Sequence, residues 1–117
     1  MSKTIFLDPG HGGRDPGAVN GTRFESHDNL RLALRVQAIL QRQQGVNVIM
    51  SRTEDVFVSL QDRTNHANRI NADLFVSLHR NSFTNNIANG FEIWIFTTAG
   101  AVDEGAAREF LERTIDH

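Results

Sequence analysis

The chain has 117 residues, which is enough for one domain with a modest hydrophobic core, and 39% of its residues are hydrophobic and 22% charged, as in an ordinary globular protein. Its formal net charge of −2, without any run of Lys and Arg, argues against nucleic acid as a partner, because phosphate binding needs clustered positive charge. The sequence contains no cysteine, so disulfides and thiolate metal sites are excluded, and any metal ion must be held by histidines and carboxylates.

The sequence shows neither a membrane-spanning segment nor an export signal. The start of the chain, MSKTIFLD, has an apolar part too short for the core of a signal peptide, and no stretch approaches the roughly 20 apolar residues of a membrane span. We therefore expect no membrane span and no signal peptide within this sequence.

The first half of the chain alternates predicted strands and helices. Residues 4–7 form an apolar, partly β-branched run before an Asp-Pro-Gly turn, which predicts a buried strand, and residues 9–23 are predicted to be loop. From 28 to 44 apolar residues recur at helical spacing, with Asp28 as the predicted N-cap and Gly45 as the predicted stop. The run VNVIM at 46–50 predicts the second strand.

The second half of the chain continues this alternation. Ser59 and Asp62 have the spacing of a capping box, which predicts a helix with Arg63 interrupting its apolar face. Residues 72–79 predict a central strand, residues 90–98 another strand, and residues 102–115 a helix. The order β-loop-α-β-α-β-β-α with short connections predicts one α/β domain over residues 1–117, with a mostly parallel twisted sheet and helices on both faces.

Two histidines occupy the predicted strand ends where α/β proteins bind ligands. His11 follows the first strand and His79 closes the third, so we expect both imidazoles to meet in one crevice at the carboxyl edge of the sheet. Singly, each is more often a turn residue or a polar strand terminus. A catalytic zinc ion would need a third His or carboxylate ligand, for which composition leaves six candidates open: Asp8, Asp15, Glu25, Asp28, Glu54 and Asp55.

Glu25 is attractive among these because it lies just before the first predicted helix, in the loop that leaves the first strand. An acidic residue at that place also has an ordinary explanation, because negative charge is favourable near a helix N-terminus. Position alone therefore does not decide the third ligand.

Six segments of the sequence, taken in order, resemble those of a known enzyme family: DPGHGGRDPGA, ESHDNLRLAL, SRTED, SLQDRTNHAN, ADLFVSLHRNS and GFEIW. The chain resembles the zinc-dependent N-acetylmuramoyl-L-alanine amidases, which cleave bacterial peptidoglycan, from Asp8 to about Phe96. This resemblance implies a Zn²⁺ ion held by His11, Glu25 and His79. It also implies peptidoglycan as the substrate, cleaved at the amide bond between N-acetylmuramic acid and L-alanine, and action at the bacterial cell wall.

The residues that follow the last predicted ligand are the predicted substrate contacts, Arg80 and Asn81. Members of the family also carry a second carboxylate on a late strand, in a segment of the form L-V-E-x-G-F, and this sequence has no such segment. The general-base glutamate is therefore expected beyond His117, and the chain is expected to be a truncated catalytic domain that lacks its last strand. An unpaired sheet edge would invite pairing with a second chain, so a dimer or swapped form through that edge is a further hypothesis.

Two other functions fit the same residues. The chain could be a peptidoglycan-binding or regulatory domain that holds zinc without cleaving the wall. It could also be a zinc-free domain in which His11 and His79 act as general acid and base. Turnover of peptidoglycan separates the first alternative from an amidase, and metal analysis separates the second.

Overall fold

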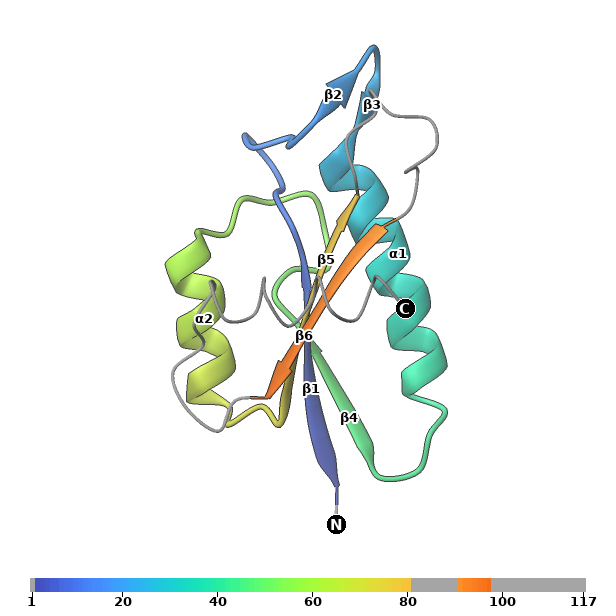
Figure 1. Ribbon diagram of the computed structural model, residues 1–117, viewed down its shortest axis with the longest axis vertical. Helices are drawn as coiled ribbons and strands as arrows, with labels where there is room; N and C mark the ends of the chain where they lie inside the picture. The colour runs from blue at the N-terminus through green and yellow to red at the C-terminus, as the bar shows by residue number, and fades with distance from the viewer. Residues whose placement is uncertain (1, 81–90, 98–117) are drawn as a thin grey trace.

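The computed structural model describes residues 2–80 and 91–97, which form one mixed α/β domain (Figure 1). The elements, in chain order, are β1 (Lys3–Pro9), β2 (Val19–Asn20), β3 (Arg23–Phe24), α1 (Glu25–Leu40), β4 (Val46–Met50), α2 (Leu60–Arg69), β5 (Leu74–Arg80) and β6 (Phe91–Thr97). The predicted alternation of strands and helices is confirmed up to β6. The helix predicted at 102–115 lies outside the described residues.

The main sheet has the strand order β4-β1-β5-β6 and is mostly parallel, as predicted. The central strand β1 pairs in parallel with β4 and β5, and β6 pairs antiparallel with β5. In this register Leu7 lies opposite both Met50 and Val76, so the carboxyl ends of three strands meet at one edge. The chain leaving β1 stays against β5, because the N–H of Gly10 donates to the Leu78 carbonyl at 3.0 Å.

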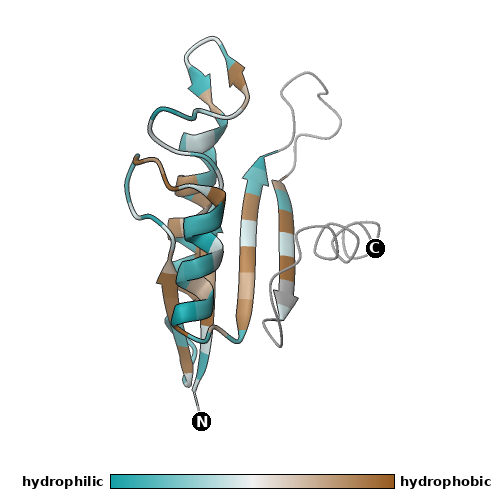
Figure 2. Ribbon diagram, turned by 90° about the vertical axis from the view of Figure 1, so that its left-hand side faces the viewer, coloured by the Kyte–Doolittle hydropathy of each residue, from teal (hydrophilic) through white to brown (hydrophobic). Residues whose placement is uncertain are grey.

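Helices cover both faces of the sheet, as the sequence predicts (Figure 1). Successive side chains of a strand point to opposite faces. Ile5 and Leu7 pack in a cluster with Ala33 of α1, whereas Phe6 packs in a second cluster with Ala67 of α2. Strand β5 is apolar along most of its length and becomes hydrophilic at its carboxyl end (Figure 2). The core therefore ends where the predicted ligands begin.

Helix α1 begins three residues earlier than predicted and ends four residues earlier. Its N-cap is Phe24, whose side chain makes no capping bond, and the predicted cap Asp28 lies inside the first turn. Main-chain carbonyls of the preceding loop satisfy the first turn instead, because Glu25 N–H donates to Ala18 O at 2.9 Å and Ser26 N–H to Pro16 O at 3.0 Å. A helix start that is capped by main-chain carbonyls of a preceding loop leaves no local pattern in the sequence.

Two smaller predictions also need correction. The predicted stop Gly45, at φ +80°, lies in the turn that leads into β4 rather than directly after the helix. The predicted loop at 9–23 contains most of a short hairpin of β2 and β3, in which Val19 pairs with Phe24 and Asn20 with Arg23. The helix predicted after Ser59 is confirmed with its cap, because the Ser59 hydroxyl accepts from the Asp62 N–H at 3.1 Å.

No helix within residues 2–80 and 91–97 is long and apolar enough to cross a membrane.

Candidate metal site

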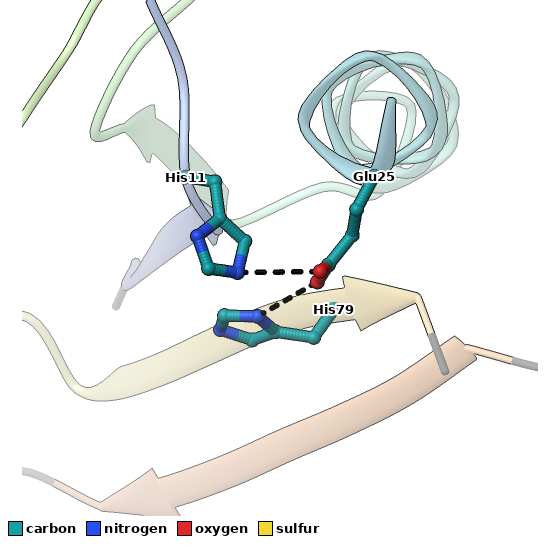
Figure 3. A group of neighbouring side chains, drawn as sticks. All are labelled: His11, Glu25 and His79. Atoms are coloured by element: carbon teal, nitrogen blue, oxygen red, sulfur yellow. Dashed lines mark hydrogen bonds and ion pairs between the residues drawn. The ribbon is translucent and has the colours of Figure 1, made fainter. Parts of the chain in front are cut away.

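His11, Glu25 and His79 come together at the carboxyl edge of the sheet from three separate segments (Figure 3). His11 lies two residues after β1, Glu25 is the first residue of α1, and His79 lies near the end of β5. Each offers one ligand atom, and these atoms all lie within 4.8 Å of one another. The convergence expected from the strand ends is therefore present, and Glu25 is the carboxylate that joins it.

Asp15 fixes which nitrogen of His11 faces the cluster. Its Oδ2 lies 2.8 Å from His11 Nδ1, while His11 Nε2 lies 3.3 Å from Glu25 Oε1. A carboxylate only accepts, so the imidazole presents an Nδ1–H to Asp15 and directs Nε2 toward Glu25. His11 itself has a left-handed backbone with φ +64°, and paired main-chain hydrogen bonds between Gly12 and Asp15 close the turn.

His79 approaches the same carboxylate from the other side and uses the other ring nitrogen. Its Nδ1 lies 3.3 Å from Glu25 Oε2, and its ring stands edge-on to that of His11 with centroids 5.3 Å apart. Two glycines make this approach possible. A methyl group on Gly10 would overlap the His79 ring, and one on Gly17 would lie 2.6 Å from both Glu25 Oε1 and His11 Cδ2. Gly10 and Gly17 thus leave room for the three ligand side chains.

The electrostatics of the cluster keep Glu25 ionised. Burial raises the pKa of Glu25, but hydrogen bonds from His11, His79 and the Ala18 N–H outweigh it and hold that pKa well below its ordinary range. Hydrogen bonding to Glu25 raises the pKa of His11 to about 8 against the opposing effect of burial, with a further contribution from Asp15. In the metal-free protein the cluster therefore combines an ionised Glu25 with a His11 that readily takes up a proton.

This donor set fits a divalent transition metal. Two imidazoles and a carboxylate are the ligands of many catalytic zinc sites, which keep a further position open for water or substrate. The hydrogen bond from His11 to Asp15 is the kind of support that metal-binding histidines usually have.

Two buried arginines hold the main chain of the loop that carries His11. Arg52 and Arg63 are each 3% exposed. Arg52 donates to the carbonyls of Pro9, Gly10, Ser26 and Glu54. Arg63 donates to the Asp8 carboxylate at 2.6 Å and to the carbonyls of Pro9, His11 and Val58. The loop is thus held by side chains from two other segments.

The sequence carries a signal for the role of Arg63. A cation on the otherwise apolar face of a short helix needs a buried partner, and Asp8 at the end of β1 supplies it. Arg52 carries no comparable signal, because its role depends on main-chain carbonyls of distant segments.

The five other candidate carboxylates lie outside the ligand group, and four of them have other partners. Asp8 pairs with Arg63, and Asp15 supports His11 without entering the cluster. Asp28 pairs with Arg23 at 2.9 Å. Asp55 accepts from the Gly13 N–H at 2.8 Å and faces His27. The carboxylate of Glu54 is also outside the described ligand group.

The predicted substrate contacts lie next to the cluster in sequence. Arg80 ends β5, with its Nε 3.4 Å from Asp28 Oδ2 and its guanidinium 5.6 Å from the centre of the Phe91 ring. Asn81 lies outside the described residues. A role for either residue in substrate binding stays a prediction.

The fold and the cluster define an α/β domain with a candidate metal site of two histidines and one glutamate at the carboxyl edge of its parallel strands. This chain belongs to the N-acetylmuramoyl-L-alanine amidase family, whose sequence model matches residues 5–115.

Individual relatives agree with this assignment. The chain is 47% identical over 98 residues to the sporulation-specific N-acetylmuramoyl-L-alanine amidase of Bacillus subtilis, covering 83% of this chain and 37% of that protein. It is 39% identical over 103 residues to the amidase AmiC of Escherichia coli, covering 87% of this chain and 25% of that protein. The solved catalytic domain of the amidase CwlV from Bacillus (Paenibacillus) polymyxa superimposes with a TM-score of 0.68 and 36% identity, covering 71% of this chain and 48% of that domain. The chain thus spans less than half the length of each.

Proposed function

We propose that this domain is the zinc-binding part of an amidase that hydrolyses the bond between N-acetylmuramic acid and L-alanine in bacterial peptidoglycan, at the cell wall. The observation that carries the proposal is the convergence of His11, Glu25 and His79 within 4.8 Å from three separate segments of a chain that belongs to the amidase family. N-acetylmuramoyl-L-alanine amidase activity is what the names of the relatives state for those proteins.

Each residue of the cluster has a distinct part in this proposal. Glu25 supplies a carboxylate that its hydrogen bonds keep ionised. His11 supplies the lone pair of Nε2, and Asp15 orients its ring. His79 supplies Nδ1 from the opposite side. In such a site Zn²⁺ supplies activation of water and polarisation of the scissile carbonyl. The cluster lies at the edge of the sheet rather than inside the core, which suits a polymeric substrate.

The general base is proposed to be a carboxylate supplied by sequence beyond His117, as the family resemblance implies. That residue would take a proton from the attacking water and return it to the leaving amine. Arg80 and Asn81 are proposed to contact the substrate beside the metal site.

One experiment tests the metal site and the reaction separately. The purified chain is titrated with Zn²⁺ by calorimetry, and the chain and a longer form of the protein are then incubated with peptidoglycan while released amino groups of L-alanine are measured. We expect one Zn²⁺ per chain and release of amino groups by the longer form. A chain that binds no zinc would contradict the proposal and favour acid–base chemistry by His11 and His79.

A second candidate function, binding of peptidoglycan without cleavage, has one observation in its favour. Within the described residues the cluster contains a single carboxylate, Glu25, which is a ligand in the proposal and not a base. A zinc-holding domain that binds peptidoglycan without cleaving it would sediment with the wall and release no amino groups in the longer form.

A further inference from the structure

Asn29 is a fully buried polar residue beside the candidate metal site. It lies on α1 one turn after Glu25, with 0% of its surface exposed. The next buried residue along the helix, Ala33, belongs to the hydrophobic cluster beneath the site. Burying a carboxamide is costly unless its hydrogen bonds are made, and Asn is a weaker helix former than Ala. Packing alone would therefore favour an apolar residue at position 29.

The carboxamide of Asn29 contacts all three segments that carry the proposed ligands. Its Nδ2 donates to the carbonyl of Gly10 at 3.1 Å and to Glu25 Oε2 at 3.3 Å. Its Oδ1 accepts from the N–H of Arg80 at 2.7 Å. Gly10 immediately precedes His11, and Arg80 immediately follows His79. One side chain therefore joins the β1 loop, the first turn of α1 and the end of β5.

The partners also fix which end of the carboxamide faces which segment. The Gly10 carbonyl and the Glu25 carboxylate only accept hydrogen bonds, whereas the Arg80 N–H only donates one. An amide offers two hydrogens on one atom and an acceptor on the other, so it satisfies all three at once. A carboxylate lacks the donors, and a hydroxyl cannot span the three partners.

We propose that Asn29 is a positioning residue that sets the spacing of His11, Glu25 and His79 for metal binding. This inference rests on the proposed zinc site. Asn29 holds one oxygen of Glu25 directly and acts on the two histidines through the main chain beside each. Partners of metal ligands commonly contribute 10–100-fold to metal affinity, and we expect an effect of roughly that size here.

The test compares Asn29→Ala with wild type and with a matched control, Ala33→Gly. The control disturbs the same buried face of the same helix one turn later, and it removes a methyl group that makes no hydrogen bond to a proposed ligand. Zinc affinity is measured by competition with a chromophoric chelator, and the visible spectrum of the Co²⁺-loaded protein reports the coordination geometry. Thermal unfolding of each metal-free protein reports any loss of stability.

We expect Asn29→Ala to lower zinc affinity roughly 10–100-fold and to change the Co²⁺ bands. Ala33→Gly should lower Tm while keeping the affinity and the bands of wild type. If wild type binds zinc tightly and Asn29→Ala stays within threefold of it with unchanged bands, Asn29 is only structural and the inference is wrong. If wild type binds no zinc, the proposed function itself fails.

If Asn29→Ala does not fold, two further measurements still test the inference. Asn29→Ser keeps a polar group but is too short to reach all three partners, so it should show the same loss to a smaller degree. In wild type, NMR of the metal-free protein should show slow exchange of the Asn29 carboxamide hydrogens and of the Arg80 amide, and zinc should shift these resonances. Rapid exchange or unshifted resonances would overturn the inference.

Discussion

Asp15 and His11 form a 2.8 Å hydrogen bond between Oδ2 and Nδ1, and this bond determines that Nε2 is the nitrogen His11 presents to Glu25. The two residues lie four positions apart in the same turn, which the main-chain bonds between Gly12 and Asp15 close. The loop that follows β1 therefore carries both a proposed ligand, His11, and the residue that orients it, Asp15.

Removing the charge of Asp15 is expected to weaken zinc binding without removing a ligand. In Asp15→Asn a neutral amide faces His11 Nδ1, so the ring is held less firmly and the pKa of His11 falls from about 8 toward 6.5. Zinc affinity should fall by about tenfold or more. Chelator competition measures the affinity, and an NMR titration of the imidazole measures the pKa. Glu54→Gln, which removes one charge from an exposed residue outside the ligand group, should change neither.

Removing a proposed ligand is expected to lower zinc affinity more than removing a residue that orients a ligand. His79→Ala and Glu25→Ala each leave two of the three donors, so zinc affinity should fall by more than the roughly 10–100-fold typical of a supporting partner. Calorimetry of the metal-free variants measures this loss. His27→Ala removes a partly exposed imidazole outside the cluster and serves as the control. A loss of only a few-fold in His79→Ala or Glu25→Ala would mean that the ligands are misassigned.

Hydrophobic patterning predicted most of the described fold. The apolar runs of β1, β4, β5 and β6 and the capping box of α2 are local signals, and each element formed where those signals lie. The rule that parallel strands bring their carboxyl ends to one edge was enough to pair His11 with His79. The start of α1 could not be predicted in the same way, because the carbonyls of Ala18 and Pro16 cap it from a preceding loop.

The third ligand and its supports depend on information that periodicity does not carry. Six carboxylates were equal candidates by composition, and the family resemblance singled out Glu25. The apolar residues that recur at helical spacing along α1 include Ile39, which is 57% exposed, whereas the buried face begins with Glu25 and Asn29 before it becomes apolar at Ala33. Polar residues on a buried helix face have partners in other segments, and those partners become known only when the segments are assembled.

The pH dependence of the metal-free protein follows from the raised pKa of His11. Hydrogen bonding to Glu25 raises that pKa from 6.5 to about 8, so protonated His11 stabilises the metal-free fold fully below pH 6.5, and this contribution is lost as pH rises through about 8. We expect the Tm of the metal-free protein to fall across this window. Zinc must displace the proton, so zinc affinity should rise across the same window.

Proton release provides the measurement for this prediction. Calorimetric titrations with zinc at pH 7 in buffers of different ionisation enthalpy should give different apparent enthalpies, because protons leave the site. The difference should shrink at pH values well above 8. Equal enthalpies in all buffers at pH 7 would show that His11 is already neutral there.

Gly17 and Gly21 offer a matched pair for the role of glycine beside the site. Both have a left-handed backbone, with φ +69° and +63°, so an alanine at either position carries a similar strain of about 1–2 kcal/mol. A methyl group at Gly21 meets nothing within 4 Å, whereas one at Gly17 lies 2.6 Å from Glu25 Oε1 and His11 Cδ2. Gly21→Ala should therefore lose stability but keep its zinc affinity. Gly17→Ala should lose both, as measured by urea unfolding and chelator competition, and equal zinc affinity in the two variants would contradict the steric role.

The pair of Arg63 and Asp8 is expected to dominate the stability of the loop that carries His11. Both side chains are buried, and Arg63→Met leaves the Asp8 carboxylate without its cation. The variant also removes the Arg63 hydrogen bonds to the carbonyls of Pro9 and His11, of which Pro9 keeps its bond from Arg52. Removing one member of a buried ion pair costs about 3–5 kcal/mol of unfolding free energy, because an uncompensated charge stays buried. Urea unfolding of the metal-free protein measures this loss.

The double variant Asp8→Asn with Arg63→Met separates the charge from the main-chain contacts. Neutralising Asp8 removes the uncompensated charge, so part of the stability should return, while the Arg63 hydrogen bonds to the carbonyls of Pro9 and His11 are still missing. Zinc affinity should therefore stay below wild type even where stability recovers. A double variant as unstable as Arg63→Met alone would indicate that Arg63 acts through the carbonyls and not through Asp8.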